Sequence, residues 1–168
     1  DERHVKFTDL MPLLETIKKM DINIEFNIEG YPSKKFCDTV NKIKPDQITL
    51  VPDPPEAITS SIGWDCEKNK KFLIEVVNEF KKNGIRVSLF INPSTKTLEN
   101  LYEIKPDRIE LYTHDYALKF EGNPKKSVEP YINVAKFIKD IPNIGINAGH
   151  DLNLNNLDFL LKNIPSIL

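Results

Sequence analysis

The sequence predicts an α/β protein built on a parallel sheet, and three observations support this class. Short stretches of β-prone apolar residues alternate with longer stretches whose apolar residues recur every three to four positions. Proline, asparagine and glycine fall at the boundaries between the two kinds of stretch. The phrase Ile-Lys-Pro-Asp occurs at 43–46 and again at 104–107, each time before a β-prone stretch. Such repetition is typical of strand–helix units and favours a parallel sheet.

The β-prone stretches define the predicted strands. Each is rich in Ile, Val, Leu, Phe or Tyr and is bounded by turn-forming residues. The predicted strands are INIEFNIE at 22–29, QITLVP at 47–52, RVSLFIN at 86–92, RIELYT at 108–113 and IGINAG at 144–149.

The longer stretches are predicted to be amphipathic helices. Ser33 is a residue type that caps a helix N-terminus, and Asn83-Gly84 are types that accept the left-handed conformation at a helix C-terminus. Proline after Lys44 and Lys105 disfavours helical geometry there, so each Lys-Pro-Asp ends a helix before a strand. The predicted helices span 7–20, 33–44, 69–84, 95–105, 127–141 and 153–164.

Two architectures fit this alternation, an open doubly wound sheet and a closed (β/α)₈ TIM barrel. No glycine-rich dinucleotide fingerprint or P-loop follows any predicted strand. Polar residues instead gather near the C-terminal ends of the strands, where barrels build their active sites. We therefore expect a barrel. Because a barrel needs eight strands and five are predicted, we interpret residues 1–168 as a single domain that is an incomplete barrel, lacking its N-terminal and C-terminal strands.

Composition sets few further limits. A net charge of −2 and a pI near 6.0 indicate no nucleic-acid partner. No apolar run approaches the roughly 20 residues of a membrane span. Cys37 and Cys66 form neither a metal motif nor a disulfide pattern, and no signal peptide is visible. These features predict a cytoplasmic protein without a metal.

Two carboxylates, Glu25 and Glu110, stand inside predicted apolar strands. Burying a carboxylate is unfavourable unless it is paired or functional. Each one alone fits a structural ion pair as well as a site, but two on separate strands of one sheet favour a site. His150 follows the small pair Ala148-Gly149 and precedes a helix, which suits proton transfer, although a lone histidine there also fits a structural role.

Two further segments are candidates for binding substrate. His4 follows Arg3, and the pair suits a phosphate. The connection at 51–69 is long for this architecture and contains Thr59 among its hydroxyl residues. Long loops at a barrel's active rim are often lids, so we expect this loop to close over substrate; a plain surface excursion is the alternative.

Six motifs follow one another along the chain: DERH, NIE, IKPDQITLVPD with TSSIGWD, GIRVSLFI, DRIELYT with YA, and NAGHDLN. Their order resembles the pyridoxine 5′-phosphate synthase family, whose fold is a (β/α)₈ barrel. The resemblance covers nearly the whole chain, which corresponds to about strands 3 to 7. It implies condensation of 3-amino-2-oxopropyl phosphate with 1-deoxy-D-xylulose 5-phosphate by acid–base catalysis, without metal or organic cofactor, in a cytoplasmic homo-oligomer.

The resemblance also implies roles for individual residues. Glu25, in the first Asn-Ile-Glu, is matched to the general base. His150 is matched to the proton donor, and Glu110 to the group that stabilises the transition state. His4 and Thr59 are placed on the deoxyxylulose phosphate side. Asp151, where the family commonly has glycine, is placed at the amino-ketone phosphate through its backbone.

Two alternatives stay open on the sequence alone. One is a different phosphate-binding barrel enzyme that acts on a sugar or amino-sugar phosphate. The other is a non-catalytic barrel that serves as a binding or scaffolding subunit.

Overall fold

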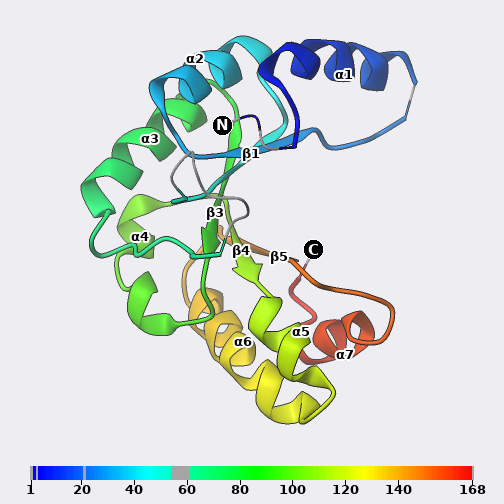
Figure 1. The fold of residues 1–168 in the computed structure, drawn as a ribbon. Helices are drawn as coiled ribbons and strands as arrows, with labels where there is room; N and C mark the ends of the chain where they lie inside the picture. The colour runs from blue at the N-terminus through cyan, green and yellow to red at the C-terminus, as the bar shows by residue number, and fades with distance from the viewer. Residues whose placement is uncertain (1, 3, 21, 54–60, 168) are drawn as a thin grey trace.

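A single parallel sheet forms the centre of the molecule, and its five strands lie side by side in chain order (Figure 1). The structure is a computed structural model that describes residue 2 and residues 4–20, 22–53 and 61–167. The strands are β1 (Asn27–Gly30), β2 (Gln47–Leu50), β3 (Arg86–Ile91), β4 (Arg108–Tyr112) and β5 (Gly145–Gly149).

Helices connect the strands and lie along one side of the sheet as an arc (Figure 1). The predicted helix at 95–105 is divided into a 3₁₀ turn and a short α-helix, and the segment after β4 contains a helix that was not predicted. The helical elements are α1 (Phe7–Lys19), α2 (Lys34–Ile43), α3 (Lys70–Lys82), η1 (Thr95–Leu98), α4 (Leu101–Ile104), α5 (His114–Phe120), α6 (Pro124–Lys139) and α7 (Leu157–Asn163).

The strand order distinguishes the two architectures that the sequence left open. A doubly wound sheet reverses its strand order at a switch point and carries helices on both faces. Here the order is sequential, every neighbouring pair is parallel, and the helices follow the chain around one face. This arrangement confirms the α/β class and is consistent with part of a (β/α)₈ barrel.

The outer face of the sheet supplies the core. Alternate residues of β4, Ile109 and Leu111, are fully buried, while Arg108, Glu110 and Tyr112 are partly exposed on the opposite face. The buried strand residues pack against buried positions of the helices. The helix residues in this core include Phe36, Val40, Leu73, Val77, Phe80, Val134 and Ile138.

The repeated Ile-Lys-Pro-Asp builds the same turn twice. Lys44 and Lys105 adopt left-handed conformations, with φ of 53° and 55°, and end their helices. Asp46 accepts a hydrogen bond from the backbone N–H of Phe26 (2.8 Å), and Asp107 accepts one from Val87 (2.9 Å). Each aspartate therefore ties the start of its own strand to the preceding strand of the sheet.

The first predicted strand is wrong over most of its length. The prediction covered 22–29, whereas β1 contains only Asn27–Gly30. Ile22 and Ile24 are each 46% exposed, so their apolar character does not mark a buried strand. None of the helices in the described ranges combines the length and apolar character needed to cross a bilayer.

Candidate functional site

The inner face of the sheet, opposite the helices, is lined by polar side chains. The parallel register places Glu29, Thr49, Ser88 and Arg108 in one row, and Glu110 beside Asn147 in the next. Thr49 Oγ1 of β2 lies 3.3 Å from Glu110 Oε2 of β4, across the intervening strand. Strands two apart in a flat sheet are separated by roughly 10 Å. The short contact therefore shows that the sheet curls and brings alternate strands together on its inner face.

Glu110 is the inner-face carboxylate that is most removed from water. Burial is the main cause that raises its pKa to about 7, and the negative charge of Glu29 acts in the same direction. The hydrogen bond from Thr49 opposes this shift. Gly149 leaves room for the other oxygen, because a Cβ there would lie only 2.8 Å from Oε1. Glu110 is thus held on both sides and is able to exchange a proton near neutral pH.

Glu29, in β1, is the acidic residue that the sequence reasoning missed. The sequence contains Asn-Ile-Glu twice, at 23–25 and at 27–29. Only the second copy lies in a strand, and its glutamate is followed by Gly30 at the strand's C-terminal end. The signal that distinguishes the copies is this glycine, followed by the Ser33 cap of the next helix. Glu25, which the resemblance matched to the base, lies outside the strand, and its role as the base stays a prediction.

The structure places Glu25 before β1, at the opposite end of the sheet from Glu29. Its carboxylate is 43% exposed and forms an ion pair with Arg86, the first residue of β3. It reaches the inner face only from that N-terminal side, where it lines an open cavity of about 490 Å³ together with Glu110. The Glu25 carboxylate is therefore engaged by a guanidinium at that end of the sheet, away from the C-terminal rim.

His150 comes directly after β5 and faces the inner side of the sheet. Its φ is 85°, a left-handed conformation that is unusual for histidine. Its ring packs against Phe90, with centroids 5.2 Å apart, and edge-on against Tyr112 at 4.9 Å. These aromatic contacts hold the imidazole at the C-terminal rim of the sheet.

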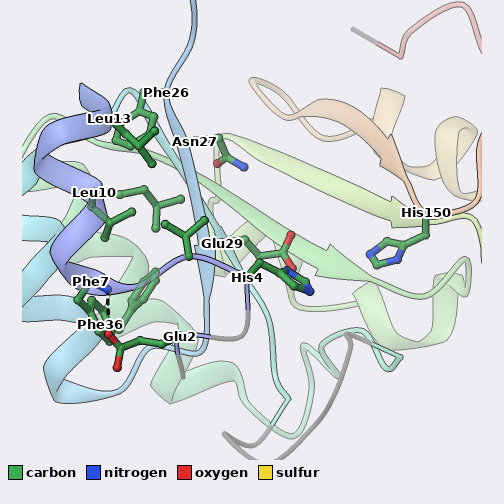
Figure 2. A pocket seen from close by; sticks show the side chains of 12 residues that line it. Glu2, His4, Phe7, Leu10, Leu13, Phe26, Asn27, Glu29, Phe36 and His150 are labelled. Carbon is green, nitrogen blue, oxygen red and sulfur yellow. Dashed lines mark hydrogen bonds between the residues drawn. The ribbon is translucent and has the colours of Figure 1, made fainter. Parts of the chain in front are cut away.

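A cavity of about 370 Å³ brings three of the candidate residues together. Glu29 and His4 project into it from one side, and His150 points toward them from the other (Figure 2). Apolar side chains of α1 and its surroundings, including Phe7, form the rest of the wall together with Glu2 and Asn27. A carboxylate and two imidazoles around one cavity can transfer protons to and from a bound molecule.

Asp151 is not among the residues that line this cavity. Asp151 also has a positive φ, of 58°, and its Oδ2 lies 2.7 Å from Nδ1 of His114. Its side chain is therefore engaged by α5, while its backbone follows His150 directly. Thr59 lies outside the described residues, so its role stays a prediction.

Only part of the predicted lid lies within the described residues. Asp53 is buried three residues after the end of β2, and Gly63 packs against the backbone at Ile91, where a Cβ would lie 2.4 Å from that residue's Cα. The indole of Trp64 donates a hydrogen bond to the carbonyl of Leu50 at 2.8 Å. The residues after 62 are thus packed onto β2 and β3 as a base for the loop.

The side chains in the described part of the chain do not form a metal site. Within the part of the chain that the structure describes, no group of three or more His, Cys, Asp or Glu side chains is placed to hold a metal ion.

Comparison with known proteins identifies the family. The family model described as "Pyridoxal phosphate biosynthesis protein PdxJ" matches residues 1–168. Curated relatives named "Pyridoxine 5'-phosphate synthase" include the proteins of Christiangramia forsetii, 47% identical over 165 residues, and Flavobacterium johnsoniae, 45% identical over 168. The protein of Bacteroides fragilis is 48% identical over 168 residues.

These matches cover 98%, 100% and 98% of this chain, and 67%, 68% and 67% of the three relatives. The chain therefore spans about two thirds of the length of each relative. The resemblance inferred from the motifs is confirmed: the chain belongs to the PdxJ family of pyridoxine 5′-phosphate synthases.

Proposed function

We propose that this protein condenses 3-amino-2-oxopropyl phosphate with 1-deoxy-D-xylulose 5-phosphate to form pyridoxine 5′-phosphate, phosphate and water. One observation carries the proposal within this family: Glu29, His4 and His150 line one cavity, and Glu110 lies on the same sheet face. Imine formation, enolisation, phosphate elimination and ring closure each move a proton. A set of acid–base groups around one cavity meets that requirement.

The surroundings of Glu29 and Glu110 suit these two carboxylates to different roles in the proposed reaction. Glu29 is the proposed general base in place of Glu25, because it shares its cavity with both histidines. Glu110 has a pKa raised to about 7, so near neutral pH it is present both with and without its proton. In the protonated form it donates a hydrogen bond to an oxygen that gains negative charge, which stabilises the transition state. His150 is the proposed donor to leaving oxygens.

The phosphate groups bind at the rim. His4 lines the cavity and is proposed to contact the phosphate of deoxyxylulose phosphate, with Thr59 from the loop. The backbone that follows His150 is proposed to contact the phosphate of the amino ketone at Asp151. The carboxylate of Asp151 lies 2.7 Å from Nδ1 of His114, and its negative charge stays next to that backbone contact.

The rest of the architecture is part of the same proposal. We propose that residues 1–168 form about strands 3 to 7 of one barrel domain, that the active protein is a homo-oligomer, and that it acts in the cytoplasm without a cofactor. The sequential curled sheet and the coverage of about two thirds of each relative support the first point.

The decisive experiment is product formation by the full-length protein. Incubation with both substrates should release phosphate and yield pyridoxine 5′-phosphate, detected by its absorbance and by mass. Reactions that lack either substrate are the controls. Phosphate release without the ring would indicate another phosphate-binding barrel enzyme. Binding of neither substrate, with no product, would indicate a scaffold and overturn the proposal.

A further inference from the structure

A hydrogen-bond chain crosses the inner face of the sheet and ends on Glu110. Arg86 Nε donates to Gln47 Oε1 at 2.7 Å, and Gln47 Nε2 donates to Asn27 Oδ1 at 3.3 Å. Asn27 Nδ2 lies 3.2 Å from Thr49 Oγ1, which lies 3.3 Å from Glu110 Oε2. The chain joins β1, β2, β3 and β4, and at its far end Arg86 is paired with Glu25.

The direction of this chain follows from its first member. A guanidinium has donors and no acceptor, so Gln47 must turn its oxygen toward Arg86 and its amide nitrogen toward Asn27. Asn27 then presents its own nitrogen to Thr49, whose hydroxyl proton is left to point at Glu110. Each link points toward the carboxylate, and successive donors polarise one another in the same sense.

Thr49 is suited to both protonation states of Glu110. Its hydroxyl lies 3.3 Å from Glu110 Oε2 and 3.4 Å from Asn27 Oδ1. With the carboxylate ionised, the proton points at Glu110, because an ionised acceptor forms the stronger bond. With Glu110 protonated, Thr49 accepts from it and donates to Asn27 instead. Thr49 is fully buried, so water does not compete for these bonds.

We propose that Thr49 is a positioning residue for Glu110: as the last donor of a chain that begins at Arg86, it fixes the carboxyl group and sets the pH at which it exchanges its proton. Without Thr49, one oxygen of Glu110 would be buried with no donor from β2. The consequence for catalysis rests on the proposed function. The consequence for the titration of Glu110 is independent of the proposed function. The titration and the catalytic effect are measured separately.

Other charged groups around Glu110 also influence its pKa. Glu29 on β1 raises the pKa of Glu110. Glu25, before β1, and Arg108, on β4, line the same cavity, and Arg86 on β3 acts through the chain. Strand β5 contributes Asn147 and Gly149, which carry no charge. None of these groups is changed by a substitution at Thr49, so a shift in that variant reports the hydroxyl.

The test is the titration of Glu110 in the full-length protein, followed by ¹³C NMR of labelled glutamate carboxyls and assigned with Glu110→Gln. Thr49→Val keeps the shape and removes the donor, so the pKa of Glu110 should rise by about one unit above its wild-type value. Thr49→Ser keeps a hydroxyl and should restore the wild-type titration. The pH dependence of product formation should move with the NMR titration in each variant.

Ser88 provides the matched control. It occupies the same row as Thr49 on the neighbouring strand, is fully buried, and its Oγ has no hydrogen-bond partner among the described residues. Ser88→Ala should leave the titration of Glu110 unchanged. Gln47→Met interrupts the chain two links earlier and should raise the pKa of Glu110 by a smaller amount.

Three outcomes would overturn the inference: an unchanged pKa in Thr49→Val, an equal shift in Thr49→Ser, or the same shift in Ser88→Ala. If Thr49→Val does not fold, a wild-type titration in Gln47→Met would overturn it instead. Failure of the wild-type protein to form product would count against the proposed function alone, because the NMR titration needs no turnover.

Discussion

Gly149 leaves the space that the Glu110 carboxylate occupies: a Cβ at residue 149 would lie 2.8 Å from Glu110 Oε1. Gly149→Ala should therefore displace Glu110 from its contact with Thr49. Displacing a catalytic group by about 1 Å can lower the rate by roughly 100-fold. We expect a fall of that order in kcat, together with a loss of about 1–3 kcal/mol in the free energy of unfolding.

Gly122→Ala is the control for this change. The nearest atom to a Cβ at Gly122 is the carbonyl oxygen of Lys119 at 3.7 Å, an ordinary contact. Its kcat should equal that of the wild type. Steady-state kinetics and urea unfolding of both full-length variants decide the matter, and equal kcat in Gly149→Ala and wild type would contradict the prediction.

The two copies of Asn-Ile-Glu predict opposite outcomes for their glutamates. Glu29→Gln should lower kcat by about 10²–10⁴-fold, because an amide cannot take up and return a proton. Glu25→Gln should leave kcat within a few-fold of the wild type. It should cost roughly 0.2–1 kcal/mol of stability, the range for an exposed ion pair such as that with Arg86. Kinetics of both variants over a range of pH would show the reverse order if Glu25 were the base.

Glu110 should make stability depend on pH. Its pKa in the fold is raised to about 7 from an ordinary 4.5, mainly by burial, so the fold favours the protonated form. Its stabilising contribution is complete below about pH 4.5 and is lost as the pH rises through about 7. Relative to Glu110→Gln, the wild type should lose roughly 1–3 kcal/mol between pH 5 and pH 8.

Urea unfolding of the full-length protein at the two pH values measures this difference. Glu103→Gln is the control, because a hydrogen bond from Lys70 lowers the pKa of Glu103. That contribution is lost only as the pH falls below the ordinary range for glutamate, so no change is expected between pH 5 and pH 8. A constant difference between wild type and Glu110→Gln would show that Glu110 does not titrate in this range.

Asp151 should weaken the binding of 3-amino-2-oxopropyl phosphate more than that of deoxyxylulose phosphate. Its carboxylate lies beside the backbone proposed to contact the amino-ketone phosphate, and its φ of 58° favours glycine. Asp151→Gly should lower KM for 3-amino-2-oxopropyl phosphate a few-fold and leave KM for deoxyxylulose phosphate unchanged. Asp115→Ala, which removes a carboxylate paired with Lys119 on α5, should change neither. Equal changes in both KM values would remove Asp151 from the amino-ketone side.

The site residues that the sequence could predict are those whose strand and register it also fixes. Strand β4 alternates buried Ile109 and Leu111 with partly exposed residues, so the inward direction of Glu110 follows from the period of two. His150 was placed at a strand end because Gly149 and the following helix mark that end. In both cases the local pattern and the tertiary structure agree.

The position of the first strand does not follow from apolar periodicity. The alternation of apolar and polar residues runs through both Asn-Ile-Glu copies in residues 22–29, and pairing in the sheet selects the second. Pairing with β2 begins at Asn27, which aligns with Gln47. The residue before it, Phe26, donates its backbone N–H to Asp46 in the turn that precedes β2, and this bond fixes the register. This pairing places Glu29 at the C-terminal rim of the sheet, beside the cavity. Glu25 stays at the other end, where it forms an ion pair with Arg86.

Sequence by itself determined the α/β class, the alternation of five strands with helices, and the family to which the motifs belong. Tertiary structure decided which glutamate faces the cavity, and it brought Thr49 within 3.3 Å of Glu110 across β3. The reason is that periodicity reports only which face of its own element a residue occupies. Contacts between strands two apart depend on how the whole sheet curls, and burial and the charge of Glu29 then set the pKa of Glu110.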